Sequence, residues 1–157
     1  MQHWMSQNQL LVVILAVLGF IVLWIFILNL IALASGWKRL AQRFRAQQEF
    51  GGAKWSWQSA QMRFRANYNN CLTVGGDQAD LFLRPTGLFR VGHPALSIPW
   101  VEITAQPARV FFMPVVELRL GRVEQIPFRI RPVLAERLAG AAGPSWPGTP
   151  SLEKIKI

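Results

Sequence analysis

The chain has 157 residues, a formal net charge of +9, two histidines and one cysteine. One cysteine excludes an internal disulfide, and so few histidines and cysteines argue against a zinc-ligand cluster. All charged residues lie at Lys38 or beyond, so the positive charge belongs entirely to the C-terminal part.

An uninterrupted apolar segment occupies residues 10–35, in which Asn29 is the only clearly polar side chain before Ser35. At about 1.5 Å per residue, a helix of this length covers the roughly 30 Å of bilayer hydrocarbon. Residues 1–9 lack the basic n-region of a secretory signal, although an Ala-x-Ala sequence near the end of the segment leaves cleavage as an alternative. We expect a single transmembrane helix over residues 10–35, with residues 1–9 on the non-cytoplasmic side.

Two residues of this helix suggest contacts with neighbouring protein. Trp24 lies near mid-span and needs a partner for its indole N–H. Asn29 either bonds to water or its own backbone, or donates to a neighbouring helix. We predict that both contact a partner subunit.

Residues 36–52 form a basic linker. At helical spacing, Trp37, Leu40 and Phe44 share one face, and the basic residues spread over the rest. Basic residues on this side of the span alone place the bulk of the protein in the cytoplasm. We expect an amphipathic segment at the lipid headgroups, although the charges can equally serve only to set topology. The predicted lipid contacts are Trp37, Lys38, Arg39, Arg43 and Arg45.

Residues 53–140 are expected to form a β domain. Apolar and polar residues alternate over residues 62–66, 116–120 and 126–130, which is typical of half-buried strands. Seven or eight such short segments, with others at 88–91 and 109–113, predict an antiparallel barrel or sandwich. Residues 131–140 then read as a helix with a proline in its first turn. The order indicates a split barrel closed by a C-terminal helix.

The stretch Leu88-Phe89-Arg90, followed by residues 93–103, resembles bacterial membrane-anchored PH-like (GRAM-like) domains through its I-P-W-x-E-I sequence at Ile98–Ile103. The resemblance implies an α+β membrane protein of the bacterial inner membrane, with a PH-like split barrel that binds or scaffolds and has no common catalytic residues. Residues 67–70 replace the basic loop of lipid-binding relatives, which argues against phosphoinositide-type binding.

No constellation for catalysis, metal or cofactor binding is recognisable, so we do not expect an enzyme. Cys71 lies in a predicted strand and is expected to be a buried thiol. Asp77 and Asp80 form the one close acidic pair, which suits a turn. The alternating arginines form either a solvated face or a contact with membrane or an acidic partner, and nucleic acid binding is not expected; they are Arg63, Arg65, Arg129 and Arg131.

Residues 141–157 form a Pro-rich tail that cannot build a core of its own. We predict that Trp146, Lys154 and Lys156 contact a partner. The whole pattern favours a non-catalytic accessory or scaffold subunit of a larger integral membrane complex, of respiratory or photosynthetic type. The alternative is a stand-alone tethered PH-like module that binds anionic lipid headgroups or a cytoplasmic ligand.

Overall fold

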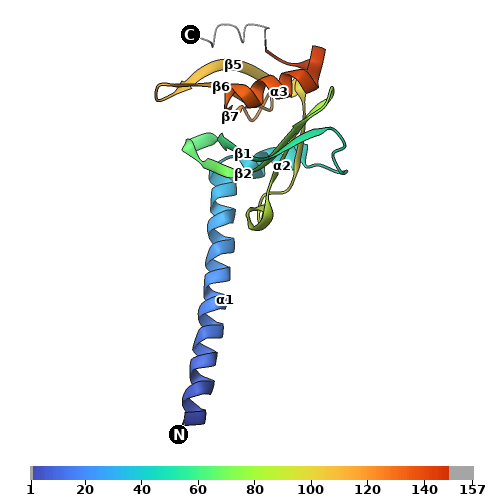
Figure 1. Cartoon of the computed structure of the whole chain (residues 1–157). Coiled ribbons are helices and arrows are strands. Elements are labelled where there is room, and N and C mark those ends of the chain that lie inside the picture. The colour runs from blue at the N-terminus through green and yellow to red at the C-terminus, as the bar shows by residue number, and fades with distance from the viewer. Residues whose placement is uncertain (1, 149–157) are drawn as a thin grey trace.

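The computed structural model of the chain describes residues 2–148, with side chains from residue 6 onward. Helix α1 (Gln2–Ala34) extends away from a β-rich unit (Figure 1). Its Ser6–Ala34 part is long and apolar enough to cross a membrane. The chain is therefore an α+β protein with one such helix in its described part, as predicted.

Seven strands form one antiparallel sheet in the order β4-β3-β2-β1-β7-β6-β5. They are β1 (Ala53–Gln61), β2 (Asn67–Gly76), β3 (Asp80–Pro85), β4 (Leu96–Pro99), β5 (Ile103–Val110), β6 (Met113–Leu120) and β7 (Ile126–Ile130). Strands β4 and β5 are the two edges of the sheet, but only the 3₁₀ turn η3 (Trp100–Glu102) separates them in the chain. The sheet must therefore curl until its edges approach each other.

The closing helix and the last two strands follow the predicted patterns. In β7, Ile126, Phe128 and Ile130 are buried while the residues between them are partly exposed, as period-two alternation requires. Helix α3 (Pro132–Ala142) begins at its proline, buries Leu134 and Leu138, and packs against β2 and β6.

Three segments expected as strands are turns or a hairpin end. Residues 63–65 form the 3₁₀ turn η1, in which Phe64 and Arg65 have φ angles of 56° and 58°. Gly87–Arg90 is the 3₁₀ turn η2, and residues 109–113 contain the bend between β5 and β6. The strand predictions were wrong there because local alternation does not reveal where an antiparallel chain must reverse.

The basic linker also differs from expectation. Its helix, α2 (Trp37–Phe44), buries Trp37, Leu40 and Phe44 and packs against β4. The apolar face was predicted correctly, but it covers the protein core instead of lipid. Beyond α2 the chain is not helical: Arg45 pairs with Leu96, and the Ala46 N–H donates to Ala95 O at 2.9 Å.

The turn between α1 and α2 requires glycine at position 36. Gly36 has φ +87°, and an added Cβ would lie 2.6 Å from Ile126 Cδ1. We expect Gly36→Ala to lower the free energy of unfolding by about 2 kcal/mol, because it adds backbone strain and a steric clash. Thermal unfolding of the detergent-solubilised full chain, followed by circular dichroism, measures this. The control is Gly51→Ala, whose Cβ would meet no atom within 4 Å; equal melting temperatures for the two variants would contradict the prediction.

Candidate functional site

The end of α1 is fastened to the β domain through Trp37. Its side chain is 0% exposed, and its indole N–H donates to Pro94 O at 2.9 Å. Its ring lies 5.8 Å from that of Tyr68 and 5.3 Å from that of His93, measured between centroids. The predicted lipid contact of Trp37 therefore needs correction, because protein encloses the whole side chain.

A buried polar chain completes this junction. The Tyr68 hydroxyl lies 2.9 Å from Ser35 Oγ and 3.0 Å from His93 Nε2, and His93 Nδ1 lies 3.0 Å from Val91 O. A carbonyl oxygen only accepts, so Nδ1 carries the proton and the neutral ring accepts from Tyr68 at Nε2. Burial lowers the pKa of His93, opposed by the bond to Val91 and assisted by the charge of Lys38. Burial also raises the pKa of Tyr68 to about 12, so both groups are uncharged at neutral pH.

The β3–β4 loop (residues 86–95) lies alongside α1 below the sheet (Figure 1). The rings of Phe89 and Trp24 are 5.9 Å apart between centroids. At Gly92, φ is +72° and an added Cβ would lie 2.9 Å from Asn29 Oδ1. On the helix, Leu28 and Ala32 are buried. The loop thus covers one face of the last turns of α1.

Two residues predicted to contact a partner, Asn29 and Trp24, lie beside this loop and have contacts within the chain. The Asn29 side-chain amide donates to Ile25 O at 2.8 Å, which is the backbone alternative for this residue. Trp24 stacks on Phe20 and contacts Phe89, while its indole N–H is buried without a partner among the described residues. The bond to Ile25 O removes the reason for assigning Asn29 to another subunit. The indole N–H of Trp24 still lacks an acceptor among the described residues, so its contact with a partner stays a prediction.

The remaining predicted residues are distributed as follows. Arg43 pairs with Glu124 at 3.1 Å and with Glu102 at 3.6 Å, so it ties α2 to the β domain. Lys38, Arg39 and Arg45 reach the surface. Trp146 packs against Trp100 with ring centroids 5.5 Å apart. Lys154 and Lys156 lie outside the described residues.

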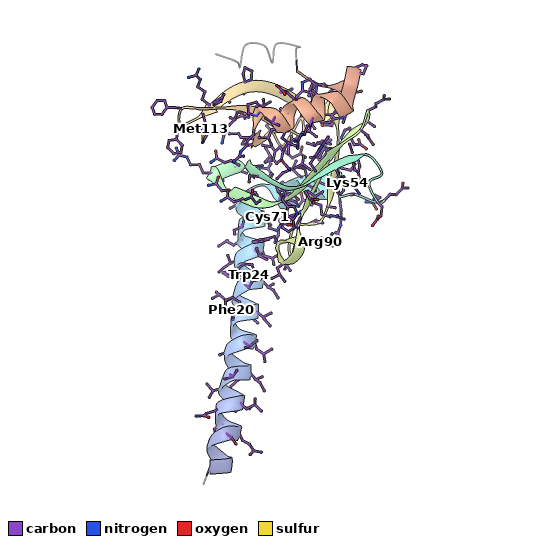
Figure 2. All side chains as sticks on the ribbon, viewed as in Figure 1. Phe20, Trp24, Lys54, Cys71, Arg90 and Met113 are labelled. Atoms are coloured by element: carbon purple, nitrogen blue, oxygen red, sulfur yellow. The ribbon has the colours of Figure 1, made fainter. Side chains whose placement is uncertain are left out.

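The β5–β6 hairpin was missed as a candidate site. Phe111, Phe112 and Met113 at its bend are 80%, 92% and 64% exposed. The hairpin projects sideways from the domain, with Met113 at its end (Figure 2). The sequence shows an unbroken apolar run at residues 110–113, but a run of this kind equally suits a buried strand, and only the structure shows that it lies at an exposed bend.

A hollow of about 250 Å³ adjoins this hairpin, and its lining includes Phe111, Arg65, Arg109, Arg129 and Glu117. Glu117 is buried and accepts from Arg129 Nε at 2.8 Å and Arg119 Nε at 2.9 Å. Burial raises the pKa of Glu117, but the hydrogen bonds and charges outweigh it and leave the pKa below its usual range. The paired carboxylate makes the base of the hollow rigid, while Arg65 and Arg109 keep its rim positive.

The described residues contain no group of three or more His, Cys, Asp or Glu side chains placed to hold a metal ion. Comparison with protein families, characterised proteins and solved structures found no match for this chain. The structure offers two surfaces as candidate sites: the exposed bend of the β5–β6 hairpin, and the hollow between α2 and the β3–β4 loop.

The buried histidine predicts a pH dependence. Because the folded-state pKa of His93 is lowered, its stabilisation is complete above the unfolded pKa of about 6.5 and declines as the pH falls below it. We expect the melting temperature of the full chain to fall between about pH 7 and pH 5, and less steeply in His93→Gln. Thermal melts at fixed ionic strength measure this. Parallel pH profiles for the two proteins would show that His93 is not the titrating group.

Proposed function

We propose that this chain is a non-catalytic accessory subunit of a larger membrane complex, in which it serves as a scaffold. The observation that carries the proposal is the exposed run Phe111-Phe112-Met113 at the end of a projecting hairpin. Aromatic and methionine side chains are enriched at protein interfaces, and burying them is strongly favourable. Their exposure to water is unfavourable, and no contact within the described chain removes it.

The surroundings of the hairpin indicate the chemistry of its partner. Phe64 in η1 is 74% exposed, and Arg63 lies over its ring at 4.5 Å from the centroid. Arg65 and Arg109 line the hollow beside Phe111, and none of these three arginines has a carboxylate within 4.0 Å among the described residues. The matching surface is an apolar pocket with an acidic rim.

The junction at Trp37 gives this surface a defined position. Because α1, α2 and the β domain share one buried core, the hairpin is held at a set distance and angle from the anchoring helix. We place α1 across a bacterial inner membrane with the β domain in the cytoplasm, since Lys38, Arg39, Arg43 and Arg45 directly follow the apolar segment.

The PH-like assignment is part of the same proposal. Two antiparallel meanders, β1–β4 and β5–β7, are joined by the pairing of β1 with β7 and followed by one packed helix. This arrangement is compatible with the resemblance of the I-P-W-x-E-I sequence. Within it, Trp100 acts structurally, since its indole N–H donates to Asp77 O at 2.8 Å. The resemblance implies a module that binds or scaffolds, which agrees with the proposed role.

The hairpin is tested by photo-crosslinking in native membranes. With p-benzoylphenylalanine at position 112, we expect one protein adduct of discrete mass. The double substitution Phe111→Ala/Phe112→Ala is expected to weaken the isolated complex about 1,000-fold, since two hot-spot aromatic residues at about 2 kcal/mol each contribute about 4 kcal/mol together. Native mass spectrometry of mild-detergent extracts measures the fraction of chain held in the complex.

The matched control carries the same cross-linker at Val123, which is 77% exposed in the β6–β7 turn. It should give no discrete adduct. Cross-links from position 112 to lipid alone, or recovery of the wild-type chain only as a free monomer, would overturn the proposal.

A further inference from the structure

A second hollow, of about 560 Å³, opens between α2 and the β3–β4 loop. Its basic lining comes from two distant parts of the chain: Lys38 and Arg45 from α2 and its C-terminal end, and Arg90 from the loop. Gln42 adds an amide. Arg90 lies on the loop beside the upper part of α1 (Figure 2).

The charge of this hollow is not compensated within the described chain. Lys38, Arg45 and Arg90 have no carboxylate within 4.0 Å among the described residues. The two carboxylates that reach α2, Glu102 and Glu124, are both paired with Arg43. Three uncompensated cations converging on an open hollow form an anion site, and Lys and Arg are the usual phosphate-binding side chains.

The position of the hollow beside α1 indicates that its phosphate belongs to a lipid headgroup. Lys38 is the first charged residue after the apolar segment, so the hollow lies where headgroups would meet α1. Phe89 contacts Trp24, which lies ten residues before the end of α1 at Ala34, about 15 Å along the helix axis. The loop therefore reaches below the level of Lys38, toward the hydrocarbon.

The end of this loop is apolar, as a segment that enters the hydrocarbon must be. Leu88 is 75% exposed, and Phe89 and Val91 are 39% and 37% exposed. Apolar side chains beneath a basic cluster reproduce the arrangement of an interfacial anchor, in which acyl chains and headgroup are contacted together. A soluble anion would use the cations but leave these apolar side chains in water.

We propose that this hollow binds the phosphate of an anionic glycerophospholipid, while Leu88, Phe89 and Val91 enter the bilayer beside α1. The inference rests on the membrane anchoring in the proposed function, but it is independent of the hairpin and its protein partner. Because the β domain is fixed to α1 through the shared core, the bound lipid would set the tilt of both together relative to the membrane surface.

Lipid retention by the purified full chain tests the site. The protein is extracted from vesicles of equal phosphatidylglycerol and phosphatidylcholine, and bound lipid is counted by native mass spectrometry. We expect wild type to retain phosphatidylglycerol selectively. Lys38→Gln/Arg45→Gln/Arg90→Gln should lower that affinity by roughly 100-fold, because each basic residue near anionic lipid contributes about fivefold.

The control variant, Lys54→Gln/Arg131→Gln/Arg137→Gln, removes the same amount of charge at three exposed positions elsewhere. We expect it to retain lipid as the wild type does. Equal retention by both triple variants would overturn the site. If glycerol phosphate without acyl chains displaces the lipid at comparable concentration, the hollow binds free phosphate compounds and the lipid assignment is wrong. No protein partner is present in this measurement, so a failed hairpin cross-link does not affect it.

The depth of the loop is measured separately. A spin label at Leu88→Cys, in a Cys71→Ser background that removes the one free cysteine, should be relaxed by oxygen and protected from a water-soluble nickel complex in vesicles. The same label at Gln78→Cys, an exposed position in the β2–β3 turn, should show the opposite. A water-exposed label at position 88 would contradict insertion of the loop.

Discussion

The structure depends on one requirement, which is that the buried indole of Trp37 must find a hydrogen-bond acceptor. A tryptophan with 0% exposure cannot leave its N–H unpaired without a free-energy cost. The acceptor is Pro94 O, 57 residues away in the chain. Meeting this requirement brings the β3–β4 loop onto the end of α1 and aligns His93 with Tyr68 and Ser35.

This junction fixes the β domain relative to α1. A flexible linker would leave the β domain free to rotate about its anchor, and its exposed surfaces would sample many positions. With Trp37 and Leu40 inside the shared core and Arg43 paired to Glu102 and Glu124, the domain moves with the helix. A surface presented at a set height and angle suits scaffolding, because it lowers the entropy lost when a partner binds.

The two proposed surfaces divide the molecule by chemistry. The side next to α1 combines uncompensated cations with apolar loop residues, which matches a lipid boundary. The hairpin side combines a rigid, charge-paired base at Glu117 with aromatic side chains held in water, which matches a protein. Both surfaces contain arginine, so charge alone does not distinguish them. The apolar side chains beside the arginines distinguish them.

The sequence by itself determined the features that depend on local periodicity. The uncharged run required a long apolar helix, alternation placed Ile126, Phe128 and Ile130 on one buried face, and turn chemistry explained Asp77, whose carboxylate accepts from two backbone N–H groups. Cys71 was likewise predicted as a buried thiol and is one. Only the tertiary structure decided which surface the apolar face of α2 covers and where the chain reverses at η1. It also decided that Arg90 and Lys38 line the same hollow. These depend on contacts between residues far apart in the chain, which no local pattern encodes.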